Sequence, residues 1–278
     1  MNPLVTPSWL KERLGSPDLC IADASWYLPQ AKRDAKAEYA AAHIPGAVFF
    51  DIDKLSDETS PWPHTLPQPQ RLAEQLGALG IGDDTTLVVY DGAGLYSAPR
   101  AWWMLRVLGH EKVHVLDGGL LAWKRSGLPL ESGAVAPAPA RFTPQPNPAL
   151  LRSFEEMLEI VRTRSAQVVD ARGAPRFFAR EAEPRPGVRG GHMPGAVNIP
   201  YHQLTAPDGT LKSPEDLRAV FAAGCVNLAA PVVTSCGSGV TAALAMLALG
   251  VAGAREVALY DGSWSEWGAR PEATVVTD

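Results

Sequence analysis

The sequence predicts an α/β protein made of two tandem copies of one domain, each a parallel sheet with helices on both faces. Three observations lead to this prediction. The segment His43–Val48 (His-Ile-Pro-Gly-Ala-Val) returns 149 residues later as His192–Val197 (His-Met-Pro-Gly-Ala-Val). Short apolar runs alternate with longer helical stretches in both halves, a pattern typical of parallel sheets covered by helices. The chain has 278 residues, which is enough for two such domains.

Two further repeats keep the same order along the chain. Leu116–Trp123 returns as Tyr260–Trp267 after 144 residues, and Ile21–Ala24 returns as Val168–Ala171 after 147. The offsets drift by a few residues while the order is kept, which indicates a duplicated domain with loop insertions and not a short solenoid repeat.

The two copies are separated by a proline-rich segment. Residues 132–148 contain five prolines, which disfavour regular backbone hydrogen bonding and favour extended conformations. We therefore expect an N-terminal domain at 1–131, a linker at 132–149 and a C-terminal domain at 150–278.

Individual elements can also be placed from the sequence. Ser213–Asp216 is typical of a helix start, with a hydroxyl cap, proline at the first helical position and acidic residues in the first turn. Ala242–Leu249 is a helical run that we expect Gly250 to end. Four apolar runs have the character of strands: Leu87–Tyr90, Val113–Leu116, Pro231–Thr234 and Val257–Tyr260.

Composition and charge narrow the function classes. The net charge is -5, so there is no basic excess to neutralise a nucleic-acid backbone. The N-terminus lacks the features of a secretory signal, and the longest apolar run, Val240–Val251, is shorter than the ~20 residues needed to cross a bilayer. We therefore expect a cytoplasmic protein that binds neither nucleic acid nor membrane. The cysteines are odd in number and have no C-x-x-C spacing, which favours neither a disulfide framework nor a thiolate metal site: Cys20, Cys225 and Cys236.

One of these cysteines occupies a position suited to catalysis. Cys236 follows a predicted strand and opens a loop that leads into a helix, and ligands of α/β proteins bind at this edge of the sheet. Gly237 and Gly239 allow the loop to curl, so that backbone N–H groups converge on the sulfur. Those donors and the helix dipole would favour the thiolate. A phosphatase loop of the C-x5-R type would need arginine at position 242, where the chain has Ala242.

The first copy cannot use thiol chemistry. Its corresponding loop, Val89–Tyr96, keeps both glycines but has Asp91 at the position of the thiol. Only the second half is therefore expected to be catalytic.

The two copies, with a His-x-Pro-Gly-Ala motif and an Asp-Gly-(Gly/Ser)-x-x-x-Trp segment in each and a cysteine loop only in the second, resemble the rhodanese superfamily of sulfurtransferases. The resemblance covers essentially the whole chain. Within that superfamily the loop Cys236–Thr241 is similar to the loop of members that act on 3-mercaptopyruvate, whereas members that act on thiosulfate typically carry an Arg-Lys pair after the cysteine.

The resemblance implies a sulfur transfer that needs no metal or organic cofactor. Cys236 would take sulfur from 3-mercaptopyruvate as a persulfide, release pyruvate, and pass the sulfur to cyanide or to a thiol such as thioredoxin. The persulfide and substrate would be held by the rest of the loop: Gly237, Gly239, Val240 and Thr241.

The same resemblance assigns roles outside the loop. Arg176 and Arg185 would bind the substrate carboxylate and keto group, a planar target that suits paired guanidinium groups. Ser238, His64 and Asp53 would form a proton relay with the cysteine, in which Asp53 orients the imidazole. Two other arginines lie close by in sequence and are not expected to contact substrate: Arg172 and Arg180.

Two alternatives remain open at this stage. One is a thiosulfate sulfurtransferase, although a neutral Gly-Ser loop suits the dianion thiosulfate less well than a carboxylate held away from the transferred sulfur. The other is a non-catalytic role, in which the loop carries a persulfide to a partner protein and the first copy acts as an interaction module.

Overall fold

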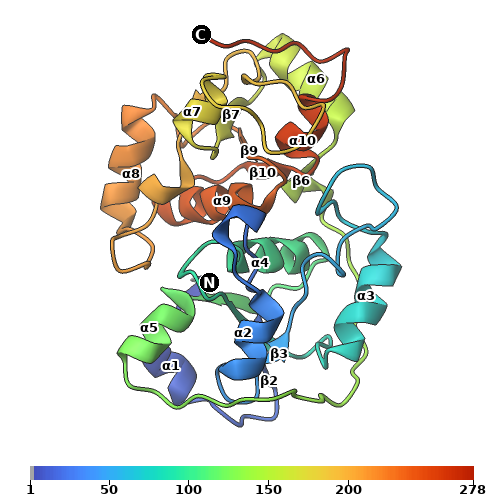
Figure 1. Ribbon diagram of the computed structural model, residues 1–278, viewed down its shortest axis with the longest axis vertical. Coiled ribbons are helices and arrows are strands. Elements are labelled where there is room, and N and C mark those ends of the chain that lie inside the picture. Colours follow the sequence, from blue (N-terminus) through green and yellow to red (C-terminus); the bar gives the residue numbers. More distant parts are fainter. Residues whose placement is uncertain (1–2) are drawn as a thin grey trace. The chain divides into compact units, whose positions relative to one another are not determined.

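The computed structural model describes residues 3–278 and divides them into two compact units, each with its own five-stranded parallel sheet (Figure 1). The predicted fold class is therefore confirmed. Unit 1 consists of Met1–Glu58, Leu66–Asn147 and Ala206–Leu211, and unit 2 consists of Thr59–Thr65, Pro148–Thr205 and Lys212–Asp278.

The two sheets have the same topology. Unit 1 has the strand order β1-β5-β4-β2-β3, and unit 2 has the corresponding order β6-β10-β9-β7-β8, with every pairing parallel. The strands are β1 (Leu4–Val5), β2 (Leu19–Asp23), β3 (Val48–Phe49), β4 (Thr86–Tyr90), β5 (Val113–Leu116), β6 (Leu151–Arg152), β7 (Gln167–Asp170), β8 (Val197–Asn198), β9 (Val232–Ser235) and β10 (Val257–Tyr260).

Helices connect these strands, as parallel pairing requires. Three are short 3₁₀ segments: η1 (Pro29–Ala31), η2 (Pro148–Leu150) and η3 (Tyr201–Gln203). The α-helices are α1 (Pro7–Lys11), α2 (Ala35–Ala41), α3 (Pro69–Ala78), α4 (Ala98–Val107), α5 (Gly119–Arg125), α6 (Phe154–Thr163), α7 (Ala174–Phe177), α8 (Pro214–Ala223), α9 (Val240–Ala252) and α10 (Ser263–Trp267).

The sequence located four of the strands and two of the α-helices. Strands β5 and β10 have the expected bounds, and β9 is shifted by one residue. Helix α8 begins as expected, because the Ser213 hydroxyl accepts the Asp216 N–H at 3.1 Å. The prediction that Gly250 ends α9 is wrong. A glycine inside a helix costs only about 1 kcal/mol, and here α9 continues to Ala252 and is capped by Gly253 at φ +108°.

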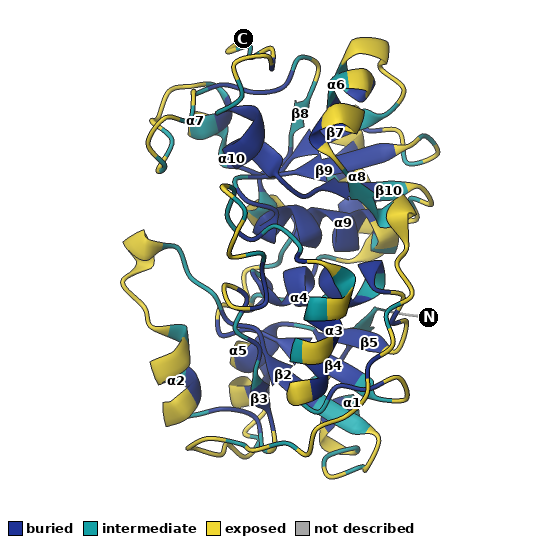
Figure 2. Ribbon diagram, turned by 90° about the vertical axis from the view of Figure 1, so that its right-hand side faces the viewer, coloured by how far each residue is buried: buried dark blue, intermediate teal, exposed yellow. Residues whose placement is uncertain are grey.

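Helix α9 is central to unit 2. Eleven of its thirteen residues are buried, and Figure 2 shows most of the helix in dark blue. The helix begins directly after the cysteine loop, so its packing fixes the position of that loop. No helix within residues 3–278 is both long and apolar enough to cross a membrane.

Each unit contains one segment from the other half of the sequence. Thr59–Thr65 belongs to unit 2, and Ala206–Leu211 belongs to unit 1. Their first residues are 147 positions apart, which matches the offset of the internal repeat, so equivalent loops of the two copies have been exchanged. His64 consequently belongs to the same unit as Cys236.

Candidate active site

The cysteine loop lies where parallel α/β sheets bind ligands, at the carboxyl end of β9. Cys236 follows the four buried residues of the strand, and Gly239, at φ +80°, caps the start of α9. A positive φ suits glycine, and it lets the chain turn from strand to helix within four residues. Cys236 is only 2% exposed, so charges and dipoles near its sulfur act with little screening by water.

The carbonyl groups of this loop are held by α10. The Cys236 carbonyl accepts the Trp264 N–H at 2.9 Å, and the Gly237 carbonyl accepts both the N–H and the hydroxyl of Ser265, at 2.9 and 2.5 Å. The Cys236 N–H donates to the Ser263 hydroxyl at 3.3 Å. These bonds fix the orientation of the loop backbone.

The amides that follow the cysteine are available to an anion. Within residues 3–278, the N–H groups from Gly237 to Thr241 make no hydrogen bond to another loop or side chain. Together with the start of α9 they form a set of donors next to the thiol. Such a set would stabilise a thiolate or a persulfide anion at Cys236.

Arg176 brings a positive charge to the loop. Helix α7 carries it, and a Cβ added to Gly237 would lie 3.2 Å from its Nη2. The guanidinium is therefore packed against the cysteine loop and is 19% exposed. Its Nε lies 3.2 and 3.3 Å from the carboxylate oxygens of Glu183, and its Nη2 also donates to Glu183.

Arg172 lies in a buried network of ion pairs, and the expectation that it does not contact substrate stays a prediction. Its side chain is fully buried, pairs with Asp170 at 2.6 Å and Glu183 at 2.7 Å, and stacks on Trp264 with its Cζ 4.1 Å from the ring centre. Burial alone lowers the pKa of this guanidinium, but the two carboxylates more than offset that effect, and the pKa lies above its usual value. Arg180 is exposed.

Ser238 and His64, which the family resemblance assigns to a proton relay, are in direct contact, and the relay itself stays a prediction. The His64 Nδ1 and the Ser238 Oγ are 2.8 Å apart, and both residues are buried. His64 has φ +64°, a strained value for a residue with a side chain, and such strain is common at functional positions. The pair can pass a proton between a hydroxyl two residues from the cysteine and an imidazole.

The other predicted site residues lie as follows. Asp53 belongs to unit 1, where the Trp26 indole N–H donates to its carboxylate at 3.1 Å, and its place in the relay stays a prediction. Arg185 is half-buried in the loop after α7, and its contact with substrate also stays a prediction. Val240 and Thr241 are buried in the first turn of α9.

Sequence reasoning missed two parts of this site. Glu183 lies seven residues after Arg176 and looks like an ordinary surface acid, but its side chain is only 3% exposed. The start of α10, which holds the cysteine loop, also gave no chemical signal. The repeat of the Asp-Gly-x-x-x-x-Trp segment could have pointed to α10, because Trp264 lies inside it.

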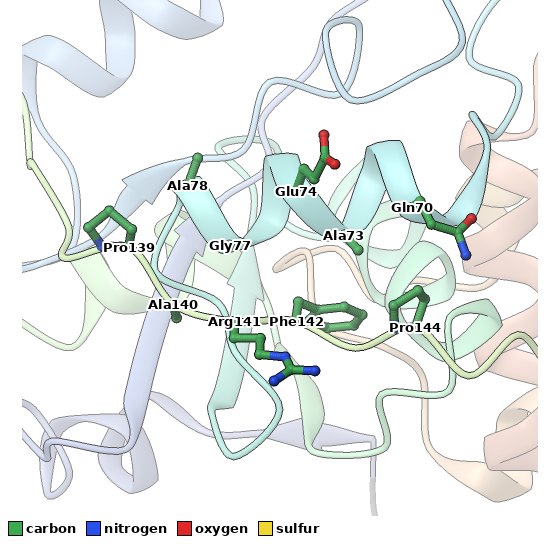
Figure 3. A pocket seen from close by; sticks show the side chains of 10 residues that line it. All are labelled: Gln70, Ala73, Glu74, Gly77, Ala78, Pro139, Ala140, Arg141, Phe142 and Pro144. Carbon is green, nitrogen blue, oxygen red and sulfur yellow. The ribbon is translucent and has the colours of Figure 1, made fainter.

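Two hollows lie in unit 1, apart from this cluster. One, of about 620 Å³, lies between α3 and the proline-rich segment, and Figure 3 shows it lined mainly by apolar side chains with Glu74 and Arg141. It includes none of the predicted site residues. A second, of about 370 Å³, includes Asp53 and Trp26. Across residues 3–278 no group of three or more His, Cys, Asp or Glu side chains is arranged to hold a metal.

Comparison with known proteins gives consistent matches. A model of the Rhodanese-like domain matches residues 6–126 and again 153–270. Human 3-mercaptopyruvate sulfurtransferase is 48% identical over 98% of this chain and 94% of its own length, and rat thiosulfate sulfurtransferase is 43% identical over 98% and 94%. The crystal structure of SseA from Escherichia coli, a 3-mercaptopyruvate sulfotransferase, matches with a TM-score of 0.87 at 44% identity and covers 95% of this chain and 99% of that one.

Proposed function

Because this chain belongs to the rhodanese-like domain family, we propose that it is a sulfurtransferase that moves sulfur from 3-mercaptopyruvate to a thiol or to cyanide through a Cys236 persulfide. The observation that carries the proposal is the arrangement at the cysteine loop. A buried thiol lies beside backbone amides that donate to no other loop or side chain in the described part of the chain, with the Arg176 guanidinium packed against the same loop.

The reaction needs a bond exchange at sulfur. The Cys236 thiolate attacks the sulfur of 3-mercaptopyruvate, and the bond between that sulfur and carbon 3 breaks. The electron pair stays on carbon, which gives the enolate of pyruvate, and a proton converts the enolate to pyruvate. The sulfur remains on the protein as Cys–S–SH, or as its anion. An acceptor thiolate then takes the outer sulfur and restores the Cys236 thiolate.

The surrounding groups have defined roles in these steps. Arg176 and Arg185 would neutralise the carboxylate and the oxygen on which enolate charge develops. The amides from Gly237 to Thr241 would stabilise the anionic sulfur. The Ser238–His64 pair would deliver the proton that the leaving enolate needs.

The proposal is tested by intact mass measurement after incubation with 3-mercaptopyruvate. We expect one added sulfur, mapped by peptide analysis to Cys236, together with an equimolar release of pyruvate. Cys225 is exposed and serves as an internal control for non-specific sulfuration. Sulfur on Cys225 and none on Cys236 would contradict the proposal.

Thiosulfate is the rival donor, because a thiosulfate sulfurtransferase is among the relatives. In unit 2 the charges of Arg172 and Arg176 are matched by those of Asp170 and Glu183, which leaves little excess positive charge for a dianion. We therefore expect a higher kcat/KM for 3-mercaptopyruvate than for thiosulfate. The reverse ranking would make thiosulfate the donor.

The acceptor and the location remain part of the proposal. Thioredoxin, another small thiol or cyanide would each complete the cycle, and we expect the reaction to take place in the cytoplasm. Steady-state turnover with a small thiol distinguishes an enzyme from a persulfide carrier, since a carrier would transfer sulfur only to its partner protein.

A further inference from the structure

The guanidinium of Arg176 is held in place by a buried carboxylate. Glu183 contacts both Nε and Nη2 of Arg176, which is the two-point geometry that fixes the plane of a guanidinium. The remaining nitrogen, Nη1, makes no hydrogen bond within residues 3–278. Glu183 thus determines which edge of Arg176 is left for a ligand.

Glu183 is itself fixed by a second arginine. Nη1 of Arg172 donates to Glu183 at 2.7 Å, while Asp170 binds the other side of Arg172 and the Gly191 carbonyl accepts from its Nη2 at 2.8 Å. The Arg172 guanidinium stacks on the Trp264 ring, and the backbone N–H of Trp264 donates to the Cys236 carbonyl. A continuous set of contacts therefore begins at the cysteine loop, passes through two arginines and Glu183, and returns to the loop at Gly237.

Unit 1 contains the same arginine–glutamate pair beside a loop that lacks a thiol. Arg33 donates to Glu38 through Nε at 2.8 Å and Nη2 at 2.6 Å, and a Cβ added to Gly92 would lie 3.4 Å from the Arg33 Nη2. Gly92 follows Asp91, just as Gly237 follows Cys236.

The two pairs differ in how firmly they are held. The Arg33 and Glu38 side chains are 39% and 41% exposed, whereas those of Arg176 and Glu183 are 19% and 3% exposed. At the position of Arg172, unit 1 has Ser25, whose hydroxyl donates to Asp23, and the second donor to Glu38 is the uncharged Tyr27 hydroxyl at 2.9 Å. The buried second arginine is therefore present only in the unit that carries the thiol.

We propose that Glu183 is a positioning residue for the reaction, which holds Arg176 so that its free edge meets the carboxylate of the substrate. This inference rests on the proposed function. Held from both sides, Glu183 removes rotational freedom from Arg176 before the substrate arrives, and an ordered guanidinium binds a planar carboxylate with less loss of entropy. Glu183 does not contact the reacting sulfur in this account, so its effect is on substrate binding.

The test is Glu183→Gln, which keeps the size of the side chain and removes its charge. We expect KM for 3-mercaptopyruvate, and the inhibition constant of pyruvate as a competing product, to rise by about 10-fold with kcat changed by less than about 3-fold. A merely structural role would lower kcat through loss of folded protein and leave KM as it was. An unchanged KM in a folded variant would overturn the proposal.

A double-mutant cycle tests whether Glu183 acts through Arg176. If it does, Glu183→Gln raises KM little further in an Arg176→Lys background, because lysine has no planar guanidinium group for Glu183 to orient. Additive effects would overturn the proposal. The matched control is Glu38→Gln, which breaks the equivalent pair in unit 1 and is expected to leave both KM and kcat unchanged.

Glu183→Asp serves if the Gln variant does not fold. It keeps the negative charge for the buried Arg172 but is shorter by one methylene, so its hold on Arg176 weakens, and we expect a smaller rise in KM in the same direction. Wild-type KM in this variant would overturn the proposal. A wild-type protein that forms no persulfide on Cys236 would instead refute the proposed function, so the two failures are distinguishable.

Discussion

In unit 1 the loop after β4 carries Asp91, and in unit 2 the loop after β9 carries Cys236. The Asp91 carboxylate accepts four backbone N–H groups at 2.8 to 2.9 Å, from residues 93, 96, 97 and 98. In unit 2 the amides that follow the cysteine bind no such group within residues 3–278. The comparison teaches that the backbone amides of this type of loop surround an anion. In unit 1 that anion is the Asp91 carboxylate, and in unit 2 the amides are available to an anionic sulfur on Cys236.

The largest effect expected is from Cys236→Ser. Serine has nearly the same shape but cannot form a persulfide, so we expect pyruvate release to fall by on the order of 10³-fold or more with little change in thermal stability. Coupled assay of pyruvate measures the loss. Turnover above a few per cent of wild type would show that the thiol is not the nucleophile.

The next effect is on the stability of unit 1. Asp91→Ala leaves two buried and two partly buried amides without their acceptor, and we expect the free energy of unfolding to fall by about 3 kcal/mol. Urea denaturation measures this change. The matched variant Cys236→Ala removes no such acceptor and is expected to cost about 1 kcal/mol. Equal losses in the two variants would break the comparison between the loops.

A smaller effect is expected in the proton relay. Ser238→Ala removes the hydroxyl that meets His64 and should lower kcat by about 10- to 100-fold. The control is Ser235→Ala, which removes a buried hydroxyl just before the loop that has no hydrogen-bond partner among residues 3–278, and it should leave kcat unchanged. Equal kcat values for the two variants would remove Ser238 from the mechanism.

The smallest effect concerns a buried acid that differs between the copies. Burial raises the pKa of Asp23 to about 6, against which the hydrogen bonds from Ser25 act only in part. The folded state therefore holds this proton more tightly than the unfolded state does. The contribution of Asp23 to the free energy of unfolding is therefore greatest below about pH 4, where both states are protonated, and falls as pH rises to about 6.

We therefore expect Asp23→Asn to reduce this loss of stability by about 1 to 2 kcal/mol between pH 4 and pH 7. Urea denaturation at the two pH values measures it. The counterpart in unit 2 is Asp170, which the buried Arg172 pairs with, so Asp170→Asn should instead destabilise the protein by about 3 kcal/mol at pH 7. Identical pH dependence in wild type and Asp23→Asn would contradict the prediction.

Much of the fold follows from the repeat. Two occurrences of the same motifs in the same order predicted two similar domains, and alternating strand and helix patterns predicted parallel sheets. The prediction that α9 ends at Gly250 was wrong. The low helix propensity of glycine costs about 1 kcal/mol, and burial of nearly every residue of the helix outweighs this cost.

The site was predictable in part. Cys236 could be found because its position, its glycines and its helix all point to one chemistry, and the Ser238–His64 contact followed from the family resemblance. Glu183 could not be found in this way. Its contacts arise from burial between two arginines, and a sequence pattern does not distinguish a buried glutamate from an exposed one.

The exchange of equivalent loops makes the two halves of the chain interdependent. If the polypeptide were cut within residues 132–149, Cys236 and His64 would lie on different fragments. The C-terminal fragment would lack Thr59–Thr65, and Ser238 would lose its contact with His64. The first half would likewise lack Ala206–Leu211, including the Leu211 N–H that donates to Asp117 at 2.8 Å. Each half of the chain therefore depends on the other for a segment that completes its own folded unit.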